Sequence, residues 1–221
     1  ACMGYATPAF AADAIVKTNK AWLSGATHIY GRMTVSGITS SNIKEKGFCY
    51  SSVNQMPTVE DGTSKIYLSN QGEIYNISQL KPATVYYIRA YVKKTNGDVV
   101  YGDPVKAITR PKGGVTYNIN DGFPSDVLTR VQAAAKEAID LWNEYTGIHG
   151  LHITINYGAQ TQTADCSYGG WMRIGPNASY QKTGTLLHEM LHAIGVGTHG
   201  TWQNSFLRSN TTSGYWLGVR A

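Results

Sequence analysis

Three side chains that can do chemistry stand within five consecutive positions of this chain: His188, Glu189 and His192. Residues four apart on a helix lie on one face, so the two imidazoles can point at a single ion. Zinc accepts neutral imidazole nitrogen and keeps one position open in catalytic sites. From its place beside the first histidine, the Glu189 carboxylate can take a proton from a zinc-activated water. The spacing therefore predicts a catalytic zinc site with Glu189 as the general base.

The third zinc ligand follows by elimination. No Asp or Glu occurs after Glu189, which leaves His199 as the remaining downstream side chain of a usual ligand type. Gly195 lies three residues after His192, where a chain leaving a helix can turn sharply because glycine tolerates positive φ. We therefore expect one zinc ion per chain, bound by His188, His192 and His199.

The residues that flank the motif are apolar: Leu186, Leu187, Met190, Leu191, Ala193 and Ile194. Such a pattern predicts a helix that is buried almost all round. Buried histidines and a buried carboxylate are costly unless they are paired or bind a metal. The flanks therefore favour a metal site over a chance occurrence of H-E-x-x-H.

The elements that must position this helix precede it in a definite order. A strand is expected near 115–119, a long amphipathic helix over 125–147, a strand over 151–157 and a further strand over 169–176. His152 falls on the polar face of the third element, where a solvated histidine is a better interpretation than a ligand.

The motif H-E-x-x-H-x-x-G-x-x-H is that of the metzincin zinc proteases, and residues 115–200 resemble their N-terminal subdomain in motif and in element order. One departure is plain, because the third histidine of the family would fall at Thr198 and stands here at His199. The resemblance implies an α+β, zincin-like domain over 115–221. It also implies a zinc-dependent endopeptidase that acts on extracellular protein substrates.

In that family an edge strand lies above the zinc and runs antiparallel to the bound peptide. The best candidate for this strand is the segment 169–176, and its expected substrate-binding residues are Trp171, Met172, Arg173 and Ile174. The alternative is an ordinary core strand. The family also carries a methionine turn downstream of the third histidine, and no Met follows Met190 here. We therefore expect the protein to continue beyond Ala221, the alternative being a minimal relative.

The first half of the chain predicts an all-β sandwich over residues 1–110, because short segments rich in Thr, Val, Ile and Tyr recur about every ten residues. Two segments of this half resemble a fibronectin type III module of secreted bacterial proteins: EKGFCYS around Cys49 and LKPATVYYIRAYV at 80–92. The resemblance implies that Tyr86 caps a corner of the sandwich. Pro and paired Gly in 111–114 predict a linker between the two domains.

Composition narrows the classes of partner. Residues 1–110 carry twelve Lys and Arg against seven Asp and Glu, whereas residues 111–221 carry seven of each, so the net charge of +5 is confined to the first half. The basic residues are scattered, which argues against nucleic-acid binding. The expected partner is a protein or peptide substrate. No apolar run is long enough to span a bilayer.

Three cysteines, Cys2, Cys49 and Cys166, leave at least one outside any disulfide within the chain. Cys2 is a candidate lipid anchor, although an arbitrary start of the chain is the slightly preferred interpretation. The expected location is extracellular or on a bacterial cell surface. The sequence gives no indication of the oligomeric state.

Two other function classes remain open. One is a surface adhesin or binding protein that retains the zinc site but is inactive or weakly active. The presence of Glu189 speaks against it. The other is a structural zinc domain, which needs four protein ligands, and Cys166 is the candidate for the fourth.

Overall fold

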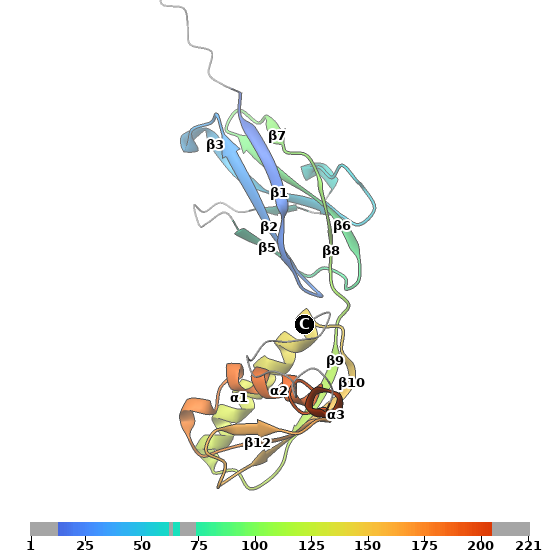
Figure 1. The fold of residues 1–221 in the computed structure, drawn as a ribbon. Helices are drawn as coiled ribbons and strands as arrows, with labels where there is room; N and C mark the ends of the chain where they lie inside the picture. The colour runs from blue at the N-terminus through green and yellow to red at the C-terminus, as the bar shows by residue number, and fades with distance from the viewer. Residues whose placement is uncertain (1–12, 62–63, 67–73, 205–221) are drawn as a thin grey trace, which may run out of the picture. The chain divides into compact units, whose positions relative to one another are not determined.

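The computed structural model describes residues 13–61, 64–66 and 74–204 (Figure 1). Its chain divides into two compact units, 1–111 and 112–221. The division falls in the segment predicted as a linker, although Gly114 at the end of that segment is already the first residue of a strand. Cys2 and the tail 205–221 lie outside the described residues.

The first unit is built from two antiparallel sheets. One has the strand order β1 (Ile15–Ser24), β2 (Ile29–Ser36) and β5 (Ile74–Ile77). The other has the order β4 (Ser64–Ile66), β3 (Ile43–Ser51), β6 (Val85–Lys94) and β7 (Val99–Tyr101), with β8 (Val105–Ile108) paired to β6. Short 3-10 helices, Ser40–Asn42 and Val59–Asp61, flank β3.

Side chains from both sheets share one core in this unit. Ile29 and Ile77 from the first sheet and Phe48, Ile88 and Ala90 from the second are almost completely buried. This two-sheet packing confirms the predicted β-sandwich. The Tyr86 ring is also buried, and its hydroxyl oxygen accepts a hydrogen bond from the Lys81 N–H at 2.9 Å, which ties the start of β6 to the segment before it.

The second unit contains a four-stranded sheet in the order β11 (Ala164–Cys166), β12 (Trp171–Ile174), β10 (His149–Tyr157) and β9 (Gly114–Ile119). β9, β10 and β12 run parallel, and β11 is antiparallel to β12. The prediction that the edge strand lies at Trp171–Ile174 is therefore wrong. That segment is paired on both sides, and the two edges of the sheet are β11 and β9.

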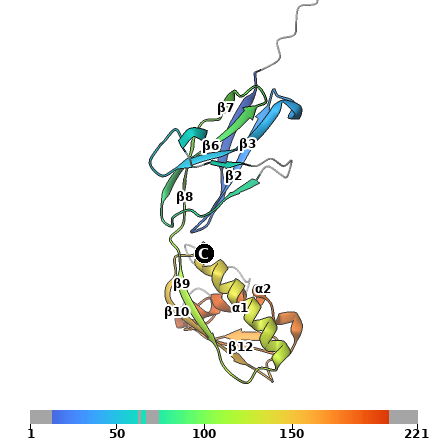
Figure 2. The ribbon, with the colours of Figure 1, turned by 180° about the vertical axis from the view of Figure 1, so that it is seen from behind.

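In the described part of this unit the sheet is accompanied by the α-helices α1 (Ser125–Tyr145), α2 (Thr183–Ala193) and α3 (Gly200–Asn204) and by a 3-10 helix, Ala178–Tyr180. α1 and α2 pack with the sheet around one core, to which Ile153, Ile155, Met172 and Ile174 contribute (Figure 2). Alternate residues point to the other face, where exposed His152 contacts side chains of Thr116 and Asn118 on β9. This placement agrees with a solvated strand histidine.

The long helix ends slightly earlier than its sequence indicates. α1 was expected to reach Gly147, but Thr146 already has extended backbone, and its N–H and hydroxyl both donate to the Trp142 carbonyl. None of the helices in the described ranges is both long and apolar enough to cross a membrane.

α2 is less enclosed than its apolar flanks suggest. Leu186, Glu189, Met190 and Ala193 are buried, but Leu191 and Ile194 are each 40% exposed. The expectation of a helix buried all round is therefore wrong. α2 packs with the sheet and α1 along one side only.

Candidate metal and active site

One face of α2 forms a wall of a cavity of about 650 Å³. Thr185, His188, Glu189 and His192 line it, at the three- and four-residue spacing that places side chains on one helical face. The rings of His188 and His192 lie 5.0 Å apart between centroids, nearly perpendicular to one another. The structure thus brings together three of the four predicted site residues.

The ring of His192 is held by the turn that follows α2. Its Nδ1 lies 2.6 Å from the Val196 carbonyl oxygen, and since a carbonyl can only accept, the proton is on Nδ1. The lone pair is therefore on Nε2, the state that a metal-binding histidine needs. Gly195 and Gly197 have φ values of +108° and +75°, so the predicted sharp turn after α2 is present and brings Val196 back to His192.

Glu189 is buried, whereas His188 is exposed and His192 is half-buried. Glu189 is 5% exposed, and its Oε2 is a buried oxygen without a hydrogen-bond partner. Burial raises the pKa of the Glu189 carboxyl, and the nearby imidazoles of His192 and His188 oppose that rise. A raised pKa suits a carboxylate that must first take up and then release a proton.

His199 does not join the other two histidines. It lies directly before α3, where its Nδ1 accepts a hydrogen bond from the Thr201 N–H at 3.1 Å, the bond typical of a helix N-cap. Its ring packs edge-on against Tyr168, with centroids 4.8 Å apart. Because Nδ1 uses its lone pair and Nε2 then carries the proton, neither nitrogen offers a lone pair to a metal in this arrangement.

Thr198 faces the cavity in place of His199. Its side chain lines the cavity, and its hydroxyl donates to the His192 carbonyl at 2.5 Å. This is the position at which the metzincin motif has its third histidine, so the one-residue departure in the sequence moves the imidazole away. Across the described ranges, no three or more His, Cys, Asp or Glu side chains are grouped so that they could hold a metal ion. His188 and His192 fit a metal, whereas His199 as placed does not.

Cys166 also lines the cavity without completing a ligand set. It is buried, and its Sγ is 3.5 Å from the Ser167 carbonyl oxygen. Burial, together with the Glu189 carboxylate, raises the pKa of the Cys166 thiol to about 12. In the absence of a metal the thiol is therefore protonated at neutral pH.

The wall opposite α2 comes from the edge strand. Ala164, Asp165 and Cys166 of β11 line the cavity, whereas Trp171, Met172, Arg173 and Ile174 do not. Met172 and Ile174 are core residues, and Trp171 and Arg173 are exposed. Arg173 makes two hydrogen bonds to the Asp165 carboxylate, at 2.9 and 2.5 Å. β11 and the cavity residues Tyr180, Lys182 and Thr198 were not predicted from the sequence.

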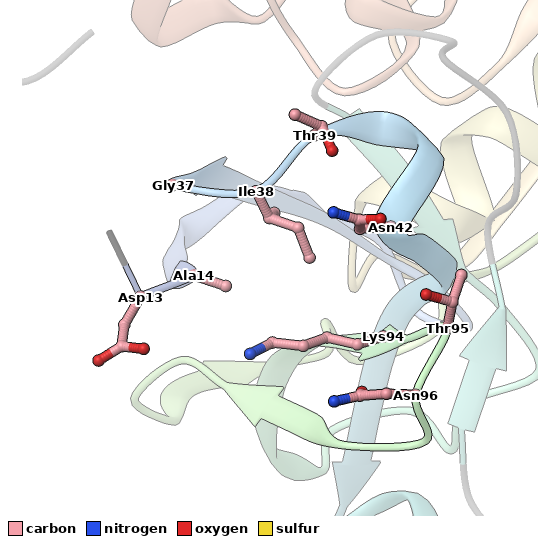
Figure 3. Close-up of a pocket in the computed structure, with 9 residues that line it drawn as sticks. All are labelled: Asp13, Ala14, Gly37, Ile38, Thr39, Asn42, Lys94, Thr95 and Asn96. Atoms are coloured by element: carbon pink, nitrogen blue, oxygen red, sulfur yellow. The ribbon is translucent and has the colours of Figure 1, made fainter. Parts of the chain in front are cut away.

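A second cavity, of about 410 Å³, lies in the first unit (Figure 3). Ala14 and Ile38 give it apolar side chains, and Lys94, Asn42 and Asn96 surround them with polar groups. Asp13 and Lys94 are its two charged residues, and no histidine or cysteine lines it.

The chain was compared with protein families, curated proteins and solved structures. No protein-family profile matches the chain, and no curated protein matches it. Similar solved structures include a fibronectin type III domain of human fibronectin type III domain containing protein 3, with 12% identity, a TM-score of 0.35 and coverage of 49% of this chain and 94% of that one.

A fibronectin type III domain of human contactin 1 is 18% identical, with a TM-score of 0.34, and the match covers 50% of this chain and 92% of that one. The sensor domain of the anti-sigma factor RsgI4 of Pseudobacteroides cellulosolvens is 15% identical, with a TM-score of 0.31 and coverage of 44% and 94%. TM-scores of this size have no bearing on what the chain does.

Proposed function

We propose that this protein is a zinc-dependent endopeptidase that hydrolyses peptide bonds of extracellular or cell-surface protein substrates. The observation that carries the proposal is the unpartnered, buried Oε2 of Glu189 beside two imidazoles. A buried carboxylate oxygen without a partner is costly, and a metal site with its water would satisfy it. The Val196 carbonyl already holds one of the imidazoles in the tautomer that binds metal.

In this proposal His188 and His192 hold the ion, and His199 is the third ligand. A zinc ion held there would supply charge that polarises a scissile carbonyl and would lower the pKa of a bound water to about 7. Glu189 accepts the proton of the attacking water and delivers it to the leaving amine. Burial raises the pKa of the Glu189 carboxyl, which makes its carboxylate a stronger base for the first of these two proton transfers.

The third ligand requires a local change. His199 must leave Tyr168 and give up its bond to the Thr201 N–H. That bond is an N-cap bond, worth about 0.5–2 kcal/mol, and the ring is at an exposed position. The change is therefore small compared with the bond to zinc that it would allow.

The substrate in this proposal lies along β11. This strand is an edge of its sheet and lines the cavity together with His188 and Glu189. An extended peptide can add to an edge strand through backbone hydrogen bonds.

We expect N-methylation of the backbone of a cleaved peptide, at the positions that face β11, to reduce kcat/KM by about fivefold or more for each lost bond. Uniform cleavage of a series methylated at every position in turn would contradict this role of β11.

The direct test is metal content and metal removal. The purified chain should contain one zinc by elemental analysis and should cleave members of an unbiased peptide library. Removal of the metal with a chelator should reduce cleavage to the uncatalysed rate, and added zinc should restore it. Cleavage that continues in metal-free protein would refute the proposal.

The alternative is a surface adhesin or binding protein whose zinc site is inactive or weakly active. The observation in its favour is the position of His199, which leaves the described residues without a three-ligand group. One bound zinc per chain without cleavage of any library peptide would establish this alternative.

A further inference from the structure

The sheet of the second unit has one face that is turned away from its core. Ile153, Ile155 and Met172 point into the core that α1 and α2 share with the sheet, so the alternate residues of the same strands point to the opposite face. These alternate residues are exposed or half-buried, and we call them the open face. They are Thr116, Asn118 and the following Asn120 from β9, His152, Thr154 and Asn156 from β10, Asp165 from β11, and Trp171 and Arg173 from β12.

Side-chain hydrogen bonds hold the amides of the open face in fixed orientations. Asn118 Oδ1 accepts a hydrogen bond from the Thr154 hydroxyl at 3.2 Å and lies 2.8 Å from His152 Nε2. Asn118 Nδ2 donates to Asn120 Oδ1 at 2.6 Å, and Asn120 Nδ2 donates to Asn156 Oδ1 at 2.8 Å. An amide nitrogen carries two hydrogens, and Asn118 and Asn120 each use one of them in this chain of bonds. The open face therefore offers oriented N–H donors that a ligand can use without the entropic cost of ordering them.

An oriented aromatic ring lies beside these amides. Trp171 is 48% exposed, and the Arg173 guanidinium carbon lies 5.2 Å from the centroid of its ring. Arg173 is fixed in turn by its two hydrogen bonds to the Asp165 carboxylate. In the pairing of β10 with β12, Trp171 is the neighbour of Thr154 and Arg173 is the neighbour of Asn156. The indole thus adds a flat apolar surface directly next to the polar side chains.

The open face carries no net charge when His152 is neutral. Asp165 and Arg173 are the only Asp, Glu, Lys or Arg residues in β9, β10, β11 and β12, and they pair with one another. Nucleic acid requires a basic surface, and the centre of a protein interface is apolar, whereas Trp171 is the only large apolar side chain of the open face. A neutral, polyhydroxylated ligand fits better. Its hydroxyl groups both donate and accept, as the amides do, and the C–H groups of a sugar ring pack on an indole.

We propose that the open face binds a neutral polysaccharide, with Trp171 against one sugar ring and the amides of Asn118, Asn120 and Asn156 bonded to hydroxyl groups of the chain. Four strands at the usual spacing measure about 14 Å across, so several sugars can lie on the face. α2, which carries the candidate zinc ligands, packs on the opposite side of the sheet. The proposal therefore goes beyond the peptidase and does not depend on it.

The test is binding of the full chain to insoluble cellulose, chitin, mannan and starch. Single-stranded DNA and heparin, both immobilised, serve as charged probes. At least one of the neutral polysaccharides should bind the protein. An increase of about tenfold in NaCl concentration should leave its dissociation constant unchanged, because salt screens only charged contacts. Removal of metal with a chelator should also leave it unchanged.

Variants of the open face identify the contacts. Trp171→Leu should weaken binding by about tenfold or more, because it removes the ring, whereas Trp171→Tyr keeps a ring and should stay within about threefold of the parent. Asn120→Ala should weaken binding by about three- to tenfold. Tyr168→Ala is the matched control, because Tyr168 is an exposed aromatic residue of the same unit that packs against His199 and does not belong to the open face. Its binding should equal that of the parent.

Thermal midpoints of the same variants separate binding from folding. Binding by Trp171→Leu as tight as that of the parent would refute the proposal, and so would equal losses in Trp171→Leu and Trp171→Tyr at unchanged thermal midpoints. If Trp171→Leu does not fold, Asn120→Ala decides, and parental binding by this variant refutes the proposal. Binding to the charged probes alone, or to none of the probes, also refutes it. Peptide cleavage enters none of these results, so the failure of either proposal leaves the other standing.

Discussion

Replacement of Glu189 by Gln is expected to lower kcat/KM for peptide cleavage by about 10²- to 10⁴-fold, the usual contribution of a positioned general base. The amide has nearly the same shape but cannot accept the proton of the attacking water. Zinc content should stay at one per chain, because neither imidazole is altered. Cleavage rates and elemental analysis of the same preparation provide the measurement.

The fold should also survive this change. Burial raises the pKa of Glu189 because the ionised form is poorly solvated, and a neutral amide removes that cost. The thermal midpoint of the Glu189→Gln variant should therefore equal or exceed that of the parent. Glu60→Gln is a suitable control, since Glu60 is an exposed carboxylate in the first unit. If the Glu189→Gln variant cleaves as fast as the parent, Glu189 is not the base.

Features set by local pattern could be predicted from the sequence. The strands of the sandwich alternate buried and exposed residues, as β6 does around Ile88 and Ala90, and this alternation is visible in the sequence. The two imidazoles and the carboxylate of α2 share a cavity because their spacing matches the helical period. Periodicity thus identified the sandwich and the centre of the candidate site.

Features set by non-local pairing could not be predicted in this way. β11 has three residues, too few to show a period, and its place at the edge depends on its pairing with β12. The segment around Met172 has the more obvious strand pattern, but its predicted edge role came from the metzincin resemblance and not from its own residues. Short edge strands such as β11 acquire their role from the sheet that they join.

His199 illustrates a competition that the motif does not reveal. The same imidazole can serve as a zinc ligand or as the N-cap of the helix that starts at Gly200. The one-residue departure at Thr198 was visible in the sequence, but its effect depends on α3, which is only five residues long. Helices this short give almost no periodic signal.

Replacement of His192 by Ala should abolish zinc binding. Loss of an outer hydrogen-bond partner of a metal ligand costs about 10–100-fold in affinity, so loss of the ligand itself should cost more than about 100-fold. Activity should disappear with the metal. His152→Ala is the matched control, because His152 is an exposed strand histidine bonded to Thr116 and Asn118, and its zinc content should match that of the parent.

His199 is best tested by a pair of substitutions, because the residue has a structural bond as well as a proposed ligand role. His199→Asn keeps a side chain that is favoured at an N-cap but removes the imidazole, whereas His199→Ala removes both. If His199 is the third ligand, the zinc affinity of both variants should fall by more than about tenfold. Only His199→Ala should also lower the free energy of unfolding of the metal-free protein, by about 1 kcal/mol. Zinc titration and unfolding of the metal-free proteins measure the two effects separately. Parental zinc affinity in His199→Asn would show that His199 only caps α3 and that the metal takes its third ligand elsewhere.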